Sequence, residues 1–452
     1  MSTRFMCIAA MVSLGTGAAR IAPGTARGAH SMAWCAAEVA APAPGQRRRA
    51  RGGDAAQAHM VLSPRPHGAH RARWAPQVER RVQELRDGAR GRVSDMMRDV
   101  HSPLQPLRDP ILEECGVELT LKRDDLIHPD VSGNKWRKLK YNLVSAAATG
   151  TSILTLGGAY SNHIAATAAV AAMCGVKTVG IIRGEELAQQ PLNPTLHAAQ
   201  AHGMHLEFVT RQQYRTLTSA AVADAQARAQ DFENCDARPS PDVFWKLFSR
   251  YGPFQILPEG GSNLLGVYGC SEILAEDAGG SDFDFVTVAA GTGATLAGLA
   301  IGASKGQQVI GFPVLKGGAF TQESARDFVQ QALGVDSSHE SVQRVGVYLD
   351  AHCGGYGKVN GELISFMRRF YRTTGVKLDP IYTGKLVMAI YDMAKKGLLH
   401  ELGQSDDSLP PGESVKRGRG APPTIKVLAV HTGGLQGIAG VELRLGEKIF
   451  PD

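Results

Sequence analysis

Lys135 lies in a stretch whose residue types suit covalent chemistry on a carbonyl compound, since residues 132–141 read SGNKWRKLKY. Ser132 and Asn134 are residues that favour a helix start, which would place Lys135 in the first turn. Backbone N–H groups point outward at that end of a helix, and their partial positive charge lowers the pKa of a nearby amine. A lysine that forms an imine needs such a depressed pKa, so the stretch predicts a nucleophilic amine.

The residues after Lys135 support the helix but also allow a second interpretation. An apolar stripe follows at i, i+4 spacing and predicts a face turned toward a core: Leu139, Leu143 and Ala147. Three more basic residues lie in the same stretch: Arg137, Lys138 and Lys140. A basic cluster is more often a solvated helix face than a catalytic site, so this stretch alone does not decide between the two.

A glycine turn follows the next predicted strand. Residues 151–156 read TSILTL, and residues 157–163 read GGAYSNH before an alanine-rich helix that ends at Gly175. A strand, a glycine turn and a helix start together form a binding site for a carboxylate or a phosphate. Ser161 and Asn162 would add side-chain hydrogen bonds, although the same pair could simply cap the helix.

A second glycine turn is the strongest phosphate-binding signal in the chain. Residues 283–290, FDFVTVAA, predict a strand, and residues 291–295, GTGAT, lead into a helix. Glycines let backbone N–H groups approach an anion, and the hydroxyls of Thr292 and Thr295 add donors. The turn lacks the Gly-Lys-Ser/Thr of a Walker A loop and the spacing of a dinucleotide fingerprint. It therefore suits a cofactor with one phosphate better than ATP or NAD.

Two tyrosines and one strand end complete the candidate site. Tyr356 lies among glycines in residues 351–358, AHCGGYGK, and Tyr382 precedes a helix in residues 378–385, LDPIYTGK. Either tyrosine could instead be an ordinary core residue. A last buried strand at 425–430 ends in HTGG, and polar residues just past the carboxyl end of a parallel strand are typical ligand contacts.

The order of elements predicts an α/β fold with parallel sheets. Strands at 117–123, 151–156 and 176–182 alternate with helical patterns, which continue at 193–202 and 220–230. The loop between the first of these strands and Gly133 brings Lys135 to the site. The 452 residues allow two or three domains and a large core.

Composition excludes several classes of protein. The chain is 43% hydrophobic and 20% charged, as is ordinary for a globular protein, and it has no run of 18 apolar residues that could span a membrane. Its seven cysteines are scattered and form no C-x-x-C pair, and its 14 histidines form no H-E-x-x-H motif. We therefore expect no disulfide framework and no metal site.

The first 100 residues differ from the rest of the chain. They hold 16 arginines, no lysine and seven acidic residues, so this part carries a charge of +9 and the remaining 352 residues carry −3. Such a composition predicts a leader that is disordered or acts in targeting, as in an organellar transit peptide. An apolar run at residues 6–19 also fits a signal-peptide core, and an inert disordered segment is a third interpretation. Residues 78–92 have an amphipathic pattern with a narrow apolar face.

Taken together, residues 101–440 resemble the pyridoxal-phosphate enzymes of the D-cysteine desulfhydrase and 1-aminocyclopropane-1-carboxylate deaminase family. The resemblance rests on five stretches in the family's order: SGNKWRKL, GGAYSNH, GTGAT, DPIYTGK and HTGGL. It implies the tryptophan-synthase-β-like fold (fold type II), in which pyridoxal 5'-phosphate lies between two parallel-sheet α/β domains. Residues 101–148 and 267–452 would form the large cofactor-binding domain, and residues 149–266 the smaller substrate-binding domain. Residues 402–423 would be a surface insertion.

The resemblance also implies roles for single residues. Lys135 would form the imine with the cofactor, and the turn of Gly291, Thr292, Gly293, Ala294 and Thr295 would bind its phosphate; Ala294 departs from the commoner GTGGT. Three residues match the loop that holds the substrate carboxylate, with Asn162 near the cofactor's 3-hydroxyl: Ser161, Asn162 and His163. The active-site tyrosines would be Tyr356 and Tyr382, and the positions near the pyridine nitrogen would be Thr383 and Thr432.

The activity that these residues imply is α,β-elimination. The amine of Lys135 would take the α-proton of a small amino acid, and D-cysteine would give pyruvate, sulfide and ammonia. The ring-opening deaminase is the rival within the family, but that branch has a glutamate at the position of Thr383. A hydroxyl there suits a neutral pyridine nitrogen, so Thr383 favours elimination. A non-catalytic cofactor-binding protein is the rival from another class, and the presence of Lys135 argues against it.

The expected partners follow from the same residues. The substrate is a small amino acid, and the negative balance of the body argues against nucleic acid. We expect no membrane contact and a homodimer. The protein would be mitochondrial or plastidic if the leader is a transit peptide and cytoplasmic otherwise. The composition of the leader further predicts that a chain starting near Val100 is soluble and active.

Overall fold

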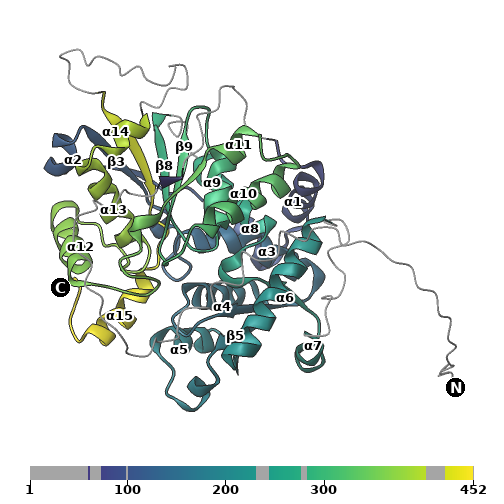
Figure 1. Cartoon of the computed structure of the whole chain (residues 1–452). Coiled ribbons are helices and arrows are strands. Elements are labelled where there is room, and N and C mark those ends of the chain that lie inside the picture. The colour runs from purple at the N-terminus through teal and green to yellow at the C-terminus, as the bar shows by residue number, and fades with distance from the viewer. Residues whose placement is uncertain are drawn as a thin grey trace, which may run out of the picture.

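The computed structural model describes residues 60–61, 73–97, 100–230, 244–275, 282–403 and 423–450. Their elements form two sheets with helices on both faces of each (Figure 1). The predicted α/β architecture is therefore confirmed. The apolar run at 6–19 lies outside the described residues, as does nearly all of the expected 402–423 insertion.

The larger sheet has the strand order β1-β10-β9-β8-β11-β3-β2. Its two edge strands pair antiparallel, and the other strands are parallel. The strands are β1 (Met60–Val61), β10 (Val345–Tyr348), β9 (Gln308–Pro313), β8 (Phe285–Ala290), β11 (Ile425–Val430), β3 (Val117–Lys122) and β2 (Leu104–Leu107).

The smaller sheet is fully parallel, with the order β6-β5-β4-β7. Its strands are β6 (His205–Val209), β5 (Thr178–Arg183), β4 (Ser152–Gly157) and β7 (Phe254–Leu257). All four lie within 149–266, the range expected for a smaller domain, and we keep the domain boundaries as a proposal.

Alternating side chains along the strands of the larger sheet supply two cores. Val286 and Val288 of β8 face one core, whereas Phe285 and Ala289 face the other, as the two-residue period of a strand requires. The first core is covered by α1 (Pro76–Gly88), α3 (Asn134–Thr149), α8 (Leu264–Ala275), α9 (Ala294–Gly302) and α10 (Phe320–Leu333). The second is covered by α2 (Pro110–Glu114), α12 (Gly361–Thr374), α13 (Thr383–Lys395), α14 (Leu398–Gly403) and α15 (Ile438–Leu445).

The smaller sheet has its own covering helices, which lie in the lower part of Figure 1. They are α4 (Asn162–Cys174), α5 (Pro194–Ala201), α6 (Arg211–Gln230) and α7 (Trp245–Tyr251). Leu139 and Leu143 of α3 pack with α4 in a further core, so the predicted apolar stripe on the lysine-bearing helix is confirmed there. The short α11 (Glu340–Gln343) is the remaining α-helix of the described residues.

Residues 73–97 are part of the folded body, which corrects the expected leader boundary near residue 100. Val78, Val82 and Leu85 of α1 are at most 2% exposed and belong to the first core. The amphipathic pattern at 78–92 therefore marks a packed helix, because a three-residue stripe is enough when a matching groove is present. No helix in the described ranges is long and apolar enough to cross a membrane.

Candidate active site

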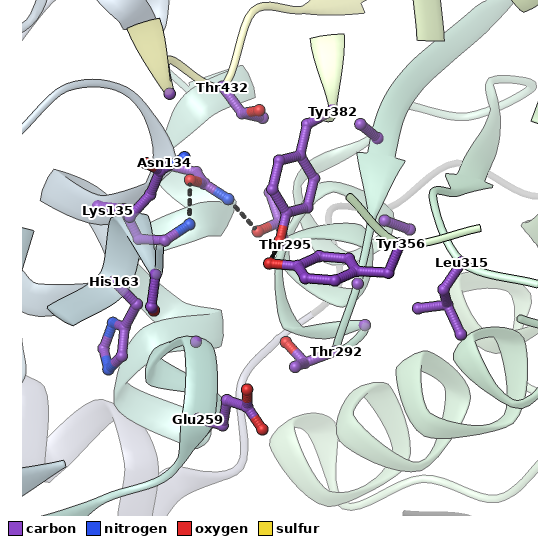
Figure 2. A pocket seen from close by; sticks show the side chains of 18 of the residues that line it. Asn134, Lys135, His163, Glu259, Thr292, Thr295, Leu315, Tyr356, Tyr382 and Thr432 are labelled. Atoms are coloured by element: carbon purple, nitrogen blue, oxygen red, sulfur yellow. Dashed lines mark hydrogen bonds between the residues drawn. The ribbon is translucent and has the colours of Figure 1, made fainter. Parts of the chain in front are cut away.

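A cavity of about 540 Å³ lies between the two sheets. Its walls come largely from segments that follow the carboxyl ends of parallel strands, the usual place for ligands in such folds. Figure 2 shows the side chains of Lys135, Tyr356 and Tyr382 around this space. Nearly all of the predicted site residues line it: Lys135, Ser161, Asn162, His163, Gly291, Thr292, Gly293, Thr295, Tyr356, Tyr382 and Thr432. Ala294 and Thr383 are not among the lining residues.

Lys135 is in the first turn of α3, as predicted, but the helix start differs from the expected one. The cap residue is Gly133, at φ 70°, and neither Ser132 nor Asn134 caps the helix with its side chain. A Cβ on Gly133 would lie 1.9 Å from the carbonyl oxygen of Thr432, so only glycine lets the two segments meet there. This close approach brings the start of α3 against the end of β11.

The basic residues around Lys135 are buried, so the solvated-face interpretation is wrong. Arg137 pairs with Asp124, with 3.0 Å between Nη2 and Oδ1, and the Ser102 hydroxyl donates to the same carboxylate. Lys138 Nζ donates to the Gly260 carbonyl at 3.1 Å. Lys140 pairs with Glu272 at 3.0 Å. These bonds anchor the helix and the loop that precedes it.

The environment of Lys135 makes its amine a nucleophile near neutral pH. Burial, followed by the positive charge of Lys138, lowers the pKa of Lys135 to about 7. Nζ donates a hydrogen bond of 2.9 Å to Asn134 Oδ1, and Asn134 Nδ2 donates at 2.9 Å to Thr295 Oγ1 (Figure 2). Asn134 therefore links the lysine to the second glycine turn.

That turn, residues 291–295, forms the expected cradle at the start of α9. Gly293 is the cap residue of the helix, and a Cβ on it would lie 3.1 Å from the backbone nitrogen of Ala325. Thr292 Oγ1 lies 2.5 Å from Ser262 Oγ. Ala294 is fully buried in the first core, so its methyl group points away from the cavity and leaves the cradle intact.

Lys138 is a cavity residue to which the sequence assigned no role. Its Nζ bonds to the Gly260 carbonyl. Gly260 lies beside the cradle, because a Cβ built on it would be 3.3 Å from Thr292 Oγ1. The ammonium of Lys138 therefore lies close to the cradle.

We expect Lys138→Met to raise the Kd for a phosphate-bearing cofactor roughly 10- to 100-fold, because a charged hydrogen-bond donor is lost beside the anion. Equilibrium titration measures this. Lys140→Met is the control, since Lys140 pairs with Glu272 and does not line the cavity. Equal affinities in the two variants would contradict the role of Lys138.

The first glycine turn differs in detail from its expected arrangement. Ser161 lines the cavity and also caps α4, with its Oγ 3.4 Å from the Ile164 backbone nitrogen. Asn162 Oδ1 is buried without a hydrogen-bond partner, so it can accept a bond from a ligand hydroxyl.

His163 is held on both ring nitrogens by threonines rather than left free for a substrate carboxylate. Its Nε2 lies 2.8 Å from Thr155 Oγ1, and its Nδ1 lies 3.5 Å from Thr167 Oγ1. The Thr155 hydroxyl donates to the Leu257 carbonyl, so it accepts from Nε2–H. Burial, and then Lys135, hold the pKa of His163 well below its usual value, so the ring is neutral. His163 is a rigid wall of the cavity.

The two predicted tyrosines meet at the cavity. Their hydroxyl oxygens are 3.4 Å apart, and their rings are 6.2 Å apart at 73°. Burial, and then Tyr356, raise the pKa of Tyr382 well above its usual value, so its phenol keeps its proton. Tyr356 is 50% exposed and lies at the mouth.

Thr383 is turned away from the cavity, contrary to the expected contact with a ring nitrogen. Its hydroxyl donates to Asp379 Oδ2 at 2.7 Å and accepts from the Asp379 backbone N–H at 2.8 Å. Asp379 also accepts from the backbone N–H groups of Ile381 and Tyr382. The sequence analysis missed Asp379, although an aspartate a few residues ahead of a helix is a capping signal. Thr432 does line the cavity.

Several charged residues that line the cavity belong to none of the sequence motifs. Arg183 ends β5, with its guanidinium 5.6 Å from the Tyr214 ring centroid. Burial raises the pKa of Glu259, against the opposing effect of Arg183. Four further basic residues lie around the cavity: Arg211, Arg215, Lys316 and Lys358. Of these residues, only Arg183 could have been predicted from the sequence, because it lies at the end of a strand.

The site fits an aldehyde cofactor with one phosphate. A cradle of glycines and threonines and a lysine of depressed pKa line the same cavity, and Asn162, which also lines it, has a buried Oδ1 without a hydrogen-bond partner. In two parallel-sheet α/β domains, this arrangement defines the fold type II class of pyridoxal-phosphate enzymes.

Comparison with known proteins supports that class. Residues 100–404 match the model of the pyridoxal-phosphate dependent enzyme family, and the chain belongs to this family. A putative 1-aminocyclopropane-1-carboxylate deaminase of Pyrococcus horikoshii is 29% identical over 74% of this chain and 90% of its own. The mitochondrial bifunctional D-cysteine desulfhydrase/1-aminocyclopropane-1-carboxylate deaminase of Arabidopsis thaliana is 29% identical over 72% of this chain and 74% of its own. The crystal structure of a homologue of 1-aminocyclopropane-1-carboxylate deaminase superposes with a TM-score of 0.58 at 26% identity, covering 79% of this chain and 99% of that one. The family, the fold and the cofactor predicted from the sequence are therefore confirmed, and the chain is a pyridoxal-phosphate-dependent enzyme.

Proposed function

We propose that this lyase performs α,β-elimination on a small amino acid and that D-cysteine is its substrate, giving pyruvate, sulfide and ammonia. The observation that carries the proposal is the pairing of a proton acceptor with proton donors around one cavity. Lys135 has a pKa of about 7, and the phenol of Tyr382 stays protonated beside Tyr356 (Figure 2). The relative from Arabidopsis carries the desulfhydrase activity in its name.

The residues of the chain divide the work of the reaction. Bound pyridoxal phosphate supplies the electron sink that stabilises a carbanion at the substrate's α-carbon. Residues 291–295 and Lys138 would hold its phosphate, and Asn162 Oδ1 would accept from its ring hydroxyl. Ser161, at the N-terminus of α4, receives the substrate carboxylate, where the helix end favours an anion. Lys135 Nζ takes the α-proton, and the tyrosine hydroxyls bond to the leaving group.

The ring-opening deaminase remains the second candidate because both named relatives carry that activity in their names. Opening a cyclopropane demands more stabilisation of negative charge than expulsion of a thiolate. Thr383 is neutral and does not line the cavity, so it supplies no charge for that purpose. Elimination therefore fits this chain better.

The proposal is tested with a panel of D- and L-amino acids plus 1-aminocyclopropane-1-carboxylate. Sulfide and 2-oxo acid are measured for each. We expect sulfide and pyruvate from D-cysteine to exceed every other product. Faster opening of the cyclopropane than release of sulfide would overturn the assignment to this branch.

Thr383→Glu is expected to impair the enzyme rather than convert it. Thr383 is 1% exposed and bonds to the Asp379 carboxylate, so a glutamate would place a second negative charge beside it. Breaking such a buried network costs on the order of 3–5 kcal/mol. We expect lower retention of cofactor and loss of sulfide release, without new ring opening. Thr383→Ser, which keeps the hydroxyl, is the control. A gain of ring opening at full cofactor content would contradict this expectation.

We also propose that the chain acts as a homodimer and that residues ahead of β1 direct it to an organelle. The relative from Arabidopsis is named as mitochondrial, and the arginine-rich, lysine-free composition is typical of a transit peptide. A reporter fused to residues 1–57 should enter mitochondria or plastids. Retention of the reporter in the cytoplasm would overturn the targeting role, and light scattering measures the oligomeric state.

A further inference from the structure

Lys385 is a fully buried lysine that has no carboxylate partner. It is 0% exposed, and no described residue places a carboxylate within ion-pair distance of its Nζ. The ammonium instead donates to three backbone carbonyls, at 2.9 Å to His352, 2.9 Å to Gly355 and 3.4 Å to Val314. A buried cation is costly unless it is satisfied, so these three bonds are what keeps Lys385 in place. The same three bonds also hold in place the segments whose carbonyls accept them.

The main segment held by Lys385 is the loop that carries Tyr356. Residues 353–357 include four positive φ angles, at Cys353 (51°), Gly354 (91°), Gly355 (131°) and Gly357 (69°). Such a backbone has many alternative conformations, because glycine restricts it little. Tyr356 is half exposed, so packing contributes little to its position. The loop also has short backbone turns, the contact of Tyr356 with Tyr382, and a bond from Arg444 to the Gly357 carbonyl. Lys385 adds a buried anchor to these contacts.

The same helix end carries the second tyrosine. Tyr382 is the cap residue of α13, and Lys385 follows three residues later in the first turn. The Tyr382 hydroxyl lies 3.4 Å from that of Tyr356. One tyrosine is thus placed directly by α13, and the other is placed through the carbonyls that Lys385 holds. The bond to Val314 also fixes the end of β9, next to the cavity residues Leu315 and Lys316.

We propose that Lys385 is a positioning residue that holds Tyr356 against Tyr382 at the cavity mouth. The effect of Lys385 on catalysis rests on the proposed elimination, in which the tyrosines bond to the leaving group. Its anchoring of the loop does not depend on that proposal. A displaced Tyr356 would leave the phenol pair apart. Cofactor binding at the cradle would be little affected, because Lys385 contacts none of residues 291–295.

A double-mutant cycle tests the catalytic part with Lys385→Met, Tyr356→Phe and the pair of changes in holoenzyme. Methionine keeps an unbranched side chain, one atom shorter than that of lysine, and removes its donors. We expect Lys385→Met to lower kcat roughly 10- to 100-fold, as misplacement of a catalytic group does. In the Tyr356→Phe background it should add less than about twofold, because the two residues act through one group. Additive losses would overturn the proposal.

Lys122→Met is the matched control. Lys122 is also 0% exposed and donates to a backbone carbonyl at 2.7 Å, but that carbonyl belongs to Ser102, ahead of β2, and not to the loop that carries Tyr356. Its loss should lower the Tm without coupling to Tyr356→Phe. Equal coupling for Lys122 and Lys385 would mean that the cycle reports only general loosening and would overturn the proposal.

A second measurement does not need activity. Lys358 is exposed at the end of the same loop, and a lysine-specific protease can cut there. We expect Lys385→Met to speed cleavage after Lys358 about tenfold in cofactor-loaded protein, whereas Lys122→Met leaves it unchanged. An unchanged rate in Lys385→Met would overturn the anchoring. If Lys385→Met does not fold, Lys385→Gln, whose shorter side chain keeps two amide donors, replaces it in both assays, and changes in the same direction but of smaller size are expected. If D-cysteine is not a substrate, the proteolysis rate still shows whether Lys385 anchors the loop. Failure of the proposed function can therefore be distinguished from failure of the anchoring.

Discussion

Lys135→Ala should abolish turnover while the protein remains folded. A lysine that both binds the cofactor covalently and moves the α-proton contributes on the order of 10²–10⁴-fold through the proton transfer alone. The covalent role adds to that, so we expect activity below detection. Its side chain is only partly buried in the cavity wall, and it bonds to its neighbour Asn134, so the fold has little to lose.

The depressed pKa of Lys135 also predicts how cofactor capture depends on pH. Its pKa is about 7, so most of the amine is protonated at pH 6 and most of it is neutral at pH 8. Only the neutral amine attacks an aldehyde. Capture of added pyridoxal phosphate by cofactor-free enzyme should therefore accelerate between pH 6 and 8 and level off above it. Lys138→Met removes the nearby positive charge, so it should move this profile to higher pH.

Two measurements test the assignment of Lys135. Borohydride reduction followed by peptide mapping should place the cofactor on Lys135, and circular dichroism should show an intact fold in Lys135→Ala. Lys140→Ala is the control on the same helix, since Lys140 pairs with Glu272 outside the cavity. A label on Lys138 or Lys140, or appreciable turnover by Lys135→Ala, would show that another amine does the chemistry.

The parts of the fold that could be predicted are those with local signals. Strands such as β4 and β8 are short apolar runs followed at once by glycine, and each glycine turn leads into a helix. Lys135 and residues 291–295 lie on such element ends, so their convergence follows from the geometry of a parallel sheet. Motif order then identified the family, because each stretch alone is weak.

The parts that could not be predicted depend on which hydrogen-bond partner each side chain takes in the folded chain. The two threonines that hold His163 are four and eight residues away, yet which way the ring turns depends on the Leu257 carbonyl that Thr155 binds. Thr383 turns from the cavity because Asp379 satisfies its hydroxyl. A motif predicts which residue occupies such a position, but it does not predict which way the side chain turns.

The helix α1 shows the same limit most clearly. Its apolar stripe looks too thin for a core when the sequence is read locally, and the arginine-rich surroundings suggest a leader. Its partners include α3 and α8, whose contacting residues lie more than 50 positions further along the chain. Arg86 also reaches the Tyr141 hydroxyl at 2.7 Å and Glu272 at 2.9 Å.

A chain starting at Val100 is therefore expected to lose stability and cofactor, which reverses the expectation from composition. Truncation there removes the buried side chains of Val78, Val82 and Leu85 in α1, together with those of Val93 and Met96 that follow it. The three side chains of α1 alone contribute about 1.5–3 kcal/mol each when fully buried, so the loss is at least roughly 5–9 kcal/mol. Domains are typically stable by only about 5–15 kcal/mol, so little would remain. The truncation also exposes part of α3, the helix that carries Lys135, because Tyr141 and Glu272 lose their hydrogen bonds from Arg86.

A chain starting near residue 58 is the matched comparison, because it keeps β1 and α1 and lacks most of the arginine-rich segment. Thermal melts and cofactor absorbance of the two truncated chains test the expectation. The longer chain should behave like the full-length protein, and the shorter one should aggregate or purify without cofactor. Arg86→Ala in the full chain separates the two contributions of α1: it keeps the apolar contacts and removes the bonds to Tyr141 and Glu272, so its Tm should fall between the two. A soluble, cofactor-loaded chain starting at Val100 would show that α1 only lies on the body and does not stabilise it.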